Sequence, residues 1–395
     1  PTKVFSSHPG ALVEQDHLAD IQIKSYRWFK EVGLQELFEE ISPIKDYTGK
    51  ELELHFLGHY FDAPKYDEEY SKIKDLTYEA PLRIKLKLIN NKIKATKEQE
   101  VYFGDFPIMT ERGTFIINGV ERVVISQLIR SAGVYFTANI WRGRKLFGAK
   151  VIPNRGVWLE FETDPDGFIG VKIDRRRKVS VTTLLRVFGW QEATDLKKNF
   201  EDVDTGPIKY LKTTLKKDVA KTADASYTEI YKRIRPGDLA TIDNIRSLID
   251  AMFHRLDRYD LSAVGRFKIN QRLGIKKASS QATKLLGLED LVLIVREIIR
   301  LNNNQAAEPD DIDHLGNRRV RPVGELIQSR LRLGLARMRR IVQDRMSTLD
   351  INTLTPMQLI NAKPLISVSR EFFASSQLSQ FMDQVNPLAE VEHKR

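Results

Sequence analysis

Residues 81–88 read P-L-R-I-K-L-K-L, in which apolar and basic side chains alternate without a break after the proline. In an extended chain Leu82, Ile84 and Leu86 would lie on one face and the lysines and arginine on the other. Such alternation is typical of a half-buried β-strand with one face on a core and one face in water. The N-terminal part of the chain is therefore predicted to contain a sheet, and the asparagines at 90–91 offer a turn after this strand.

Two β-hairpins are predicted further along the chain. Residues 115–117 and 123–125 are apolar runs, and the N-G pair at 118–119 tolerates the positive φ angles of a type I′ turn. The span between these runs exceeds a two-residue loop, so the register stays open. Residues 158–173 hold a second pair of runs around D-P-D-G at 164–167, whose residue types favour a turn.

Helical periodicity dominates the second half of the chain. Thr355 followed by Pro356 is typical of a helix start, with proline at the first helical position, and this helix is expected to reach about residue 361. The fold class is therefore predicted to be α+β and multidomain, strand-rich early and helix-rich later. The remaining helices are expected at residues 18–29, 31–41, 181–188, 226–234, 242–256, 288–301 and 323–346.

Composition excludes several classes of protein. A chain of 395 residues is too long for one simple core, and two or three domains are expected. With 42% hydrophobic and 29% charged residues it resembles a globular protein, and it contains no apolar run of the roughly 18 residues that a membrane span needs. The first residues lack the pattern of a secretory signal, and a cysteine-free chain has no disulfide or thiolate metal site. A cytoplasmic location is compatible with these features.

The charge is unevenly distributed. The net charge is +10, yet residues 31–79 hold thirteen Asp and Glu against five Lys and Arg, so the remainder carries +18. A basic surface attracts phosphates and gains affinity from counterion release. An ordinary solubilising surface would explain the charge equally well.

Two groups of cations are candidates for binding a nucleic-acid backbone. The first, Arg175, Arg176, Arg177 and Lys178, follows a predicted strand end, from which side chains can follow a phosphate backbone. The second is rich in arginine, whose guanidinium fork suits phosphate oxygens, although some members are expected to pair with the acidic N-terminal segment. Its members are Arg318, Arg319, Arg321, Arg330, Arg332, Arg337, Arg339, Arg340 and Arg345.

The residues themselves indicate a binding surface without a catalytic centre. Three carboxylates and an imidazole at 310–314 could bind a divalent cation, but their spacing matches no ligand set and capping is the commoner role for such residues. The sequence has no Walker motif, no G-x-S-x-G, no H-E-x-x-H and no dinucleotide fingerprint. No metal site is predicted.

Residues 370–395 form a polar segment, R-E-F-F-A-S-S-Q-L-S-Q-F-M-D-Q-V-N-P-L-A-E-V-E-H-K-R. Gln377, Gln380, Gln384 and Asn386 offer hydrogen-bond donors and acceptors at many angles, which suits a surface that lines a polar ligand or a nucleic acid. A solvated loop is the simpler alternative.

This segment closely resembles the rifampicin-pocket segment of the β subunit of bacterial RNA polymerase. The same family pattern continues in order along the chain, over about residues 15–395, so the chain is expected to be the N-terminal part of a longer subunit. The blocks that carry the resemblance are residues 75–82, 113–119, 121–128, 152–156, 173–178, 257–261 and 310–319.

The resemblance implies a domain organisation. Residues 15–140 would form the first part of the protrusion, 141–315 the lobe, 316–373 a return segment of the protrusion, and 374–395 the start of the fork. The protrusion would thus be discontinuous in sequence. Together these elements would form one pincer of the polymerase cleft, over downstream DNA and the RNA–DNA hybrid.

The resemblance also implies two sets of site residues. One set lines the rifamycin pocket beside the RNA path: Arg122, Gln127, Gln377, Leu378, Gln380, Phe381, Asp383 and His393. The other set would hold a guanine of the non-template strand: Arg130, Trp158, Asp174, Arg235, Ile312 and Asp313. Arginine or a carboxylate can read the edges of guanine, and tryptophan offers a stacking wall.

Partners follow from the resemblance in the same way. DNA, RNA, the β′, α and ω subunits and a sigma factor are expected, in the cytoplasm with the nucleoid and away from any membrane. The Mg²⁺ of the family belongs to β′, and phosphoryl transfer needs such metal clamps, so this chain alone is not expected to polymerise nucleotides.

Three departures from the family pattern concern local features. Ser131-Ala132-Gly133 stands where Ser-Pro-Gly is usual, and Ala374 where glycine is frequent. Thr96-Lys97-Glu98 replaces the Ile-Lys-Glu with which some relatives dock the transcription-repair coupling translocase, so that partnership stays open.

Two other functions are weighed against the polymerase. A stand-alone module that docks transcription factors by strand addition is the alternative from a different class. A generic basic RNA-binding protein would explain the charge but not the ordered motifs. The polar C-terminal segment favours the polymerase, because a docking module has no need of it.

Overall fold

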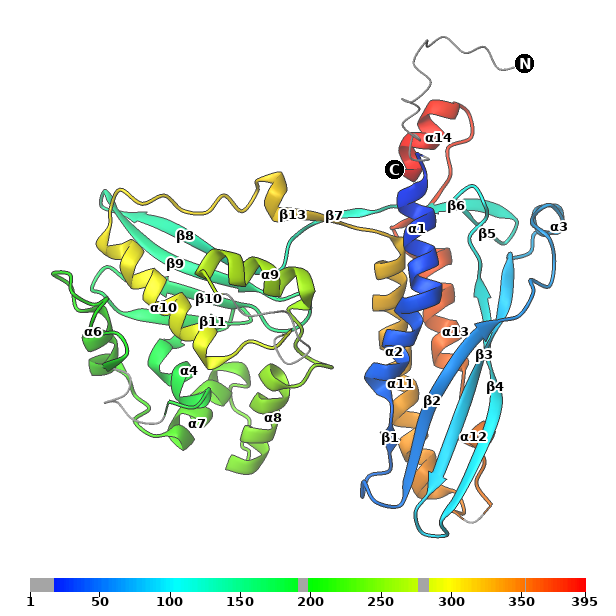
Figure 1. Ribbon diagram of the computed structural model, residues 1–395, viewed down its shortest axis with the longest axis horizontal. Coiled ribbons are helices and arrows are strands. Elements are labelled where there is room, and N and C mark those ends of the chain that lie inside the picture. Colours follow the sequence, from blue (N-terminus) through cyan, green and yellow to red (C-terminus); the bar gives the residue numbers. More distant parts are fainter. Residues whose placement is uncertain (1–17, 191–197, 276–283, 352) are drawn as a thin grey trace. The chain divides into compact units, whose positions relative to one another are not determined.

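The chain divides into two units (Figure 1). The computed structural model describes residues 18–190, 198–275, 284–351 and 353–395. Unit 1 comprises residues 1–128 and 320–395, and unit 2 comprises residues 129–319. Both units combine helices with antiparallel sheets, so the predicted multidomain α+β class is confirmed.

Unit 1 is built on a four-stranded antiparallel sheet in the order β1-β2-β3-β4. Leu82, Ile84 and Leu86 of β3 are almost fully buried, so the alternation read from the sequence does place one face of the strand on the core. A bulge interrupts the pairing of β3 with β4, where Gly104 has a φ of +112° and an added Cβ would lie 2.5 Å from Ile366. The strands are β1 (Ile44–Lys45), β2 (Leu52–Phe61), β3 (Glu79–Asn90) and β4 (Ala95–Pro107).

Long helices run alongside this sheet (Figure 1) and share its hydrophobic core. α1 (Asp20–Trp28) and α2 (Leu34–Ile41) confirm the two predicted N-terminal helices, but a π-helical segment, Phe29–Gly33, joins them without a break. α12 (Pro356–Leu359) begins at the predicted Thr355 cap and is shorter than expected, because Ile360 is already extended. The other helices of unit 1 are α3 (Glu68–Ile73), α11 (Val323–Thr348), α13 (Lys363–Arg370) and α14 (Pro387–Lys394).

A second, three-stranded sheet of unit 1 has the order β14-β6-β5. β5 (Phe115–Ile117) and β6 (Val120–Val124) form the predicted hairpin, with Asn118 at φ +49° and Gly119 at φ +77° in its two-residue loop. The strand β6 therefore begins earlier than its apolar run and includes the polar residues Glu121 and Arg122. β14 (Ser379–Phe381), from the polar C-terminal segment, pairs with the free side of β6.

Unit 2 contains a five-stranded antiparallel sheet in the order β12-β11-β10-β9-β8, with a helical core packed on it. The predicted hairpin around residues 164–167 is confirmed, with Leu159 opposite Ile173. The strands are β8 (Gly133–Trp141), β9 (Arg144–Ile152), β10 (Leu159–Thr163), β11 (Ile169–Ile173) and β12 (Val179–Ser180). The helices are α4 (Val181–Val187), α6 (Tyr210–Lys217), α7 (Ala223–Ile234), α8 (Ile242–His254), α9 (Ser262–Leu273) and α10 (Leu288–Asn303). The hairpin β8–β9 and the helices α6 and α9 were not predicted from the sequence.

A buried ion pair stabilises the helical layer of unit 2. Asp218 accepts hydrogen bonds from the Arg186 guanidinium at 2.5 Å and from the hydroxyls of Thr182 and Thr183, and both charged side chains are at most 3% exposed. Because every partner is inside the unit, removing either charge would leave the other buried and unpaired.

The chain passes from unit 1 to unit 2 within one strand and returns to unit 1 within another. β7 (Gln127–Arg130) and β13 (Arg318–Arg321) pair as a separate two-stranded sheet. Within the described residues, no helix is both long enough and apolar enough to cross a membrane.

Candidate nucleic-acid interface

The candidate site of unit 1 starts from the pairing of β14 with β6. Phe381 lies opposite Arg122, and the guanidinium carbon of Arg122 is 4.4 Å from the centre of the Phe381 ring. This geometry is a cation–π contact between residues that are distant in sequence. Phe381 is 63% exposed and therefore presents an aromatic side chain to solvent.

Arg122 also connects this strand pair to the core of unit 1. Its Nη1 donates to the carbonyls of Phe373 at 3.3 Å and Ser379 at 3.2 Å. Phe373 is buried, and its ring lies 4.7 Å from that of Phe115. Ser379 adds a hydroxyl bond of 2.6 Å to the same Phe373 carbonyl. The guanidinium is thus fixed by backbone groups, and neither Phe373 nor Ser379 was predicted to contribute.

A short chain of hydrogen bonds extends the site into α14. His393 Nε2 lies 3.3 Å from Gln380 Oε1, and the backbone N–H of Asp383 donates to His393 Nδ1 at 3.4 Å. Both contacts are satisfied when the imidazole proton is on Nε2. Gln380 in turn donates to the Gln377 carbonyl at 3.1 Å. We call Arg122, Gln377, Gln380, Phe381, Asp383 and His393 the β6–β14 cluster.

Two further predicted members of this set lie beside the cluster. Leu378 is half-buried against the core, and its carbonyl accepts from Ile125 at 2.9 Å. Gln127 is half-buried on β7, past the end of the β6–β14 pairing. Among the described residues it takes no part in the cluster's hydrogen bonds.

The second predicted set lies in unit 2 and falls into separate local groups. Arg130 and Asp313 form an exposed ion pair with an N–O distance of 3.8 Å. Trp158 accepts a backbone hydrogen bond from Asp174 at 2.9 Å, and Arg175 lies 5.4 Å over its ring. Arg235 ends α7 and pairs with Asp238 at 3.7 Å, while Ile312 is half-buried. Within the described residues, no hydrogen bond or ion pair joins these groups to one another.

The predicted backbone-binding cations have different environments. Arg175, Arg176 and Arg177 are exposed between β11 and β12. Lys178 instead turns back and pairs with Asp164 at 2.8 Å and Glu162 at 2.9 Å. Burial alone would lower the pKa of Lys178, but hydrogen bonds to these carboxylates outweigh it and raise that pKa.

The strand β13 carries the remaining two cations that were predicted to bind the backbone. Arg318 and Arg319 are both half-buried on this strand. Arg319 donates to the side-chain carbonyl oxygen of Asn154 at 3.0 Å.

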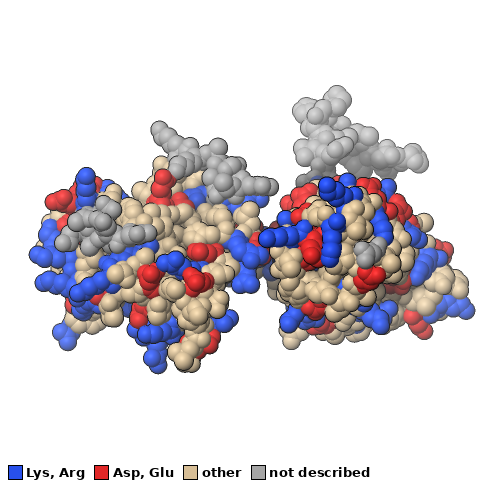
Figure 2. Space-filling view, turned by 90° about the horizontal axis from the view of Figure 1, so that it is seen from below, with Lys and Arg blue, Asp and Glu red and all other residues tan. Residues whose placement is uncertain are grey.

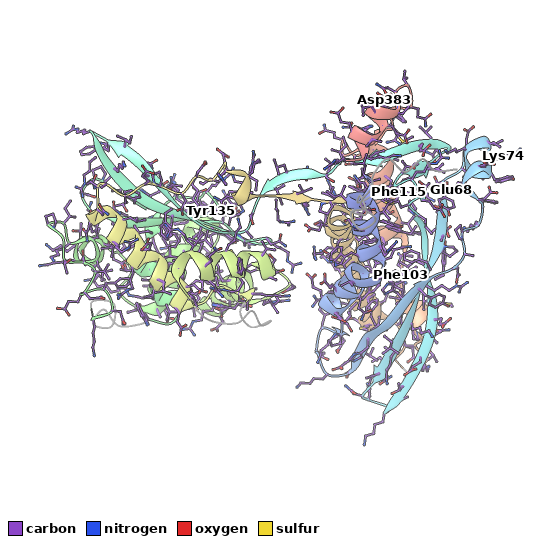
Figure 3. All side chains as sticks on the ribbon, turned by 45° about the horizontal axis from the view of Figure 1, so that its top comes forward. Glu68, Lys74, Phe103, Phe115, Tyr135 and Asp383 are labelled. Atoms are coloured by element: carbon purple, nitrogen blue, oxygen red, sulfur yellow. The ribbon has the colours of Figure 1, made fainter. Side chains whose placement is uncertain are left out.

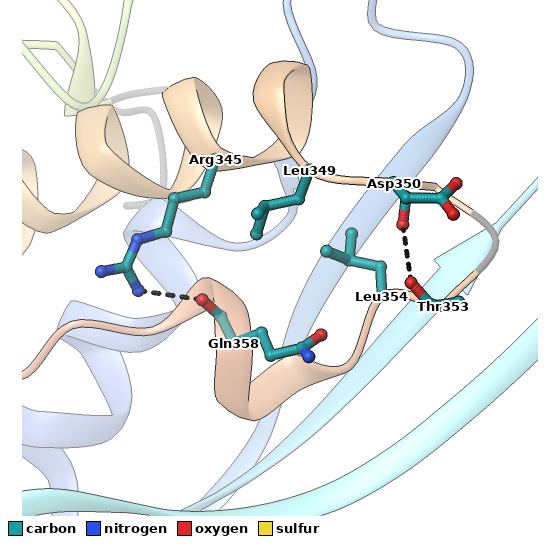
Figure 4. Close-up of a pocket in the computed structure, with 6 residues that line it drawn as sticks. All are labelled: Arg345, Leu349, Asp350, Thr353, Leu354 and Gln358. Atoms are coloured by element: carbon teal, nitrogen blue, oxygen red, sulfur yellow. Dashed lines mark hydrogen bonds between the residues drawn. The ribbon is translucent and has the colours of Figure 1, made fainter.

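The arginines of α11 are partly structural. Arg332 pairs with Glu40 of the acidic N-terminal segment at 3.0 Å, as was expected for some of them. Arg345 donates to the Gln358 carbonyl at 2.9 Å beside a hollow of about 380 Å³ (Figure 4). This hollow is lined by Arg345, Leu349, Asp350, Thr353, Leu354 and Gln358. Since Arg345 also donates to the Ile360 carbonyl, its role there is to close the end of α12.

The excess positive charge of the chain belongs to unit 2. Residues 129–319 hold 35 Lys and Arg against 25 Asp and Glu, which equals the whole net charge of +10, so unit 1 is balanced. On the face drawn in Figure 2, basic side chains are distributed widely over unit 2. The sequence alone did not predict which part of the chain carries the excess charge. The negative charge of residues 31–79 and the positive charge of the α11 arginines offset each other because both segments belong to unit 1.

The carboxylates near residue 310 serve local structure. Asp310 accepts from the Phe136 N–H at 2.8 Å and pairs with Arg272 at 3.2 Å, while Asp311 accepts from the N–H of Asp313 at 3.0 Å. Across the part of the chain that the structure describes, no group of three or more His, Asp or Glu is placed to hold a metal ion. Asp310 and Asp311 thus make local contacts with backbone N–H groups and with Arg272.

Comparison with known proteins finds one matching family model and several similar curated proteins. A family model described as RNA polymerase Rpb2, domain 2, matches residues 130–321, nearly the extent of unit 2. A DNA-directed RNA polymerase subunit beta from Chloroflexus aggregans is 49% identical over 96% of this chain and 33% of its own length. The subunit of the same name from Dehalococcoides mccartyi is 47% identical over 97% of this chain and 30% of its own length. The chain thus spans about a third of these curated relatives, whose names do not favour a stand-alone docking module.

Proposed function

The chain is homologous to bacterial RNA polymerase β subunits along almost its whole length, and we propose that it forms one pincer of the cleft of a DNA-directed RNA polymerase. In this proposal residues 15–140 and 316–373 are the protrusion, 141–315 are the lobe, and 374–395 begin the fork. Unit 1 lines the RNA path and binds rifamycins, and unit 2 contacts downstream and non-template DNA.

The observation that carries the proposal is the β6–β14 cluster. Arg122 supplies a fixed positive charge, and Phe381 supplies an exposed aromatic face beside it. Gln380 and His393 add donors and acceptors at the same edge. A base or an aromatic ligand with hydroxyl groups needs this combination of stacking surface and directional hydrogen bonds.

The charge of unit 2 supports its proposed contact with DNA. The exposed guanidiniums of Arg175, Arg176 and Arg177 can neutralise phosphates, which would release counterions. Trp158 is half-buried beneath Arg175 and could form an apolar wall for a flipped base. The exposed pair of Arg130 and Asp313 offers both a donor fork and a carboxylate for the edges of guanine.

The chemistry of nucleotide addition is assigned to a partner. Phosphoryl transfer requires metal ions that stabilise the attacking and leaving oxygens, and we assign the Mg²⁺ ligands to β′. The assembled enzyme would also include α, ω and a sigma factor, in the cytoplasm with the nucleoid. The isolated 395-residue chain is therefore expected to incorporate no nucleotide on a DNA template.

The test uses the assembled polymerase that contains this sequence and compares two aromatic residues of nearly equal exposure. Phe381 is 63% exposed in the cluster, and Phe267 is 64% exposed on α9 outside every proposed site. Phe381→Ala should raise the rifampicin concentration for half-inhibition of RNA synthesis by about 5- to 150-fold, since a lost stacking contact costs about 1–3 kcal/mol. Phe267→Ala should leave it unchanged. Equal values for both variants would refute the proposed pocket.

A further inference from the structure

A buried carboxylate lies directly behind the β6–β14 cluster. Glu121 precedes Arg122 on β6, so the two side chains leave opposite faces of the strand. Its side chain is 4% exposed, pairs with Lys72 of α3 at 2.8 Å, and accepts from the Thr114 hydroxyl at 2.7 Å. Burial alone would raise the pKa of Glu121, but the hydrogen bonds from Lys72 and Thr114 outweigh it and lower that pKa. The carboxylate is thus held in its charged form.

Glu121 also binds the polar C-terminal segment at two points. Its backbone carbonyl accepts from the Met382 N–H at 3.1 Å, and its Oε2 accepts from the Gln384 side-chain amide at 3.4 Å. Met382 and Gln384 stand on either side of Asp383, and Met382 follows Phe381 directly. In Figure 3, the labels of Glu68 and Lys74 stand at the first residue of α3 and just after its end, and that of Asp383 stands in the C-terminal segment. Glu121 therefore connects the support in α3 to the residues beside Phe381.

A second buried side chain holds the other end of the segment. Gln22 of α1 is 1% exposed, and its amide nitrogen donates to the carbonyl of Val124 at 2.9 Å and to that of Lys394 at 2.8 Å. Val124 is the last residue of β6, and Lys394 follows His393 in α14. One amide thus fixes the distance between the strand that bears Arg122 and the helix that bears His393.

We propose that Glu121 and Gln22 are positioning residues that hold the C-terminal segment in register so that Phe381, Gln380 and His393 act as one surface. The inference rests on the proposed function of the β6–β14 cluster. A buried polar group is stabilising only when its partners are in place, so these two side chains favour one arrangement of the segment over alternatives. An apolar contact would tolerate small shifts of the strand and helix, whereas a hydrogen bond loses strength with distance and angle.

The first experiment measures amide hydrogen exchange on the purified 395-residue chain. Glu121→Ala and Gln22→Met should each speed exchange across residues 380–394 by about tenfold, since each variant removes about 1.4 kcal/mol of local hydrogen bonding. Exchange in β3 should stay unchanged, because its core does not depend on either side chain. The matched control is Glu39→Ala, which removes an exposed carboxylate of α2. Glu121→Gln keeps one acceptor oxygen, enough for Thr114 or for Gln384 but not for both, so its exchange rates should lie between those of the native chain and of Glu121→Ala.

The second experiment places the same variants in the assembled polymerase and measures inhibition by rifampicin. Glu121→Ala and Gln22→Met should each raise the half-inhibiting concentration by about tenfold, and Glu121→Gln should recover only part of the difference. If Phe381→Ala weakens inhibition while both positioning variants leave exchange and inhibition unchanged, the inference fails and the proposed function stands. If Phe381→Ala has no effect, the proposed function fails, and the exchange experiment still decides whether the segment is held. Faster exchange throughout β3 in both variants would show a fold-wide structural role and overturn the inference.

Discussion

Arg122 is expected to organise the candidate site as well as to line it, and Arg122→Met tests this. Methionine keeps much of the length and apolar volume of the arginine stem but removes the guanidinium. The variant loses the two bonds to the Phe373 and Ser379 carbonyls and the contact with the Phe381 ring. The neighbouring backbone carbonyls are then left without these donors.

The size of the effect follows from these three contacts. Arg122 is half-buried, so each bond to a carbonyl is worth about 1 kcal/mol, and the cation–π contact about 0.5–1 kcal/mol. The pairing of β14 with β6 should lose about 2–3 kcal/mol of local stability. This loss corresponds to an increase of about 30- to 150-fold in the equilibrium constant for the opening of β14.

Amide hydrogen exchange on the purified chain measures this opening directly. The amides of Ser379–Phe381 should exchange about 30- to 150-fold faster in the variant, whereas those of β3 serve as an internal reference. In Arg122→Lys the exchange rate of these amides should lie between the native rate and that of Arg122→Met, because an ammonium cannot match the geometry of the guanidinium fork. Unchanged exchange in β14 would refute the view that the guanidinium holds the strand. An equal increase in β3 would mean that the effect is not local.

Three further results are expected. Asp218→Ala leaves Arg186 buried without its carboxylate and should lower the free energy of unfolding of unit 2 by about 3–5 kcal/mol in a denaturant titration. The double variant Arg186→Met, Asp218→Leu should lose much less stability, because no buried charge is left unpaired. A loss below about 1 kcal/mol in Asp218→Ala would contradict the pairing. In the assembled polymerase, we expect replacement of Arg175, Arg176 and Arg177 together with alanine to weaken the salt dependence of DNA binding. The negative slope of log affinity against log salt should become smaller in magnitude by about 2–3. An unchanged slope would mean that these side chains do not contact phosphates. Because the pKa of Glu121 is lowered on folding, its stabilisation is present above the unfolded pKa of about 4.3 and disappears as the pH falls through the folded value. The difference in unfolding free energy between the native chain and Glu121→Gln should therefore shrink below about pH 4.3, and a constant difference would contradict this assignment.

Local patterns predicted much of the secondary structure because the signals were short-range. The alternation at residues 81–88 reports which face of β3 meets the core, and Asn118-Gly119 marks a turn that needs positive φ angles. The missed elements had weaker signals. The hairpin β8–β9 has no asparagine–glycine turn, and α9 has a mixed pattern with exposed Val264 and Phe267 on its surface.

The candidate site was predicted as a set of residues but not as an arrangement. The family resemblance named Arg122, Phe381 and His393, while nothing local links a strand near residue 122 to a segment near residue 381. The supporting roles of Phe373, Ser379, Gln22 and Glu121 were not predicted. A glutamine or glutamate, in particular, reads as a surface residue until its partners are known.

The sequence by itself determined the α+β class, the strand β3, two hairpins, most of the longer helices, and the family to which the motifs are similar, since each depends on neighbouring residues or on their order along the chain. Only the tertiary structure decided that β14 pairs with β6, that the excess charge belongs to unit 2, and that Lys178 and Arg345 serve local structure. These outcomes depend on which segments of the chain folding brings together. The desolvation of a charge and the geometry of a hydrogen bond are set by whichever groups folding brings together.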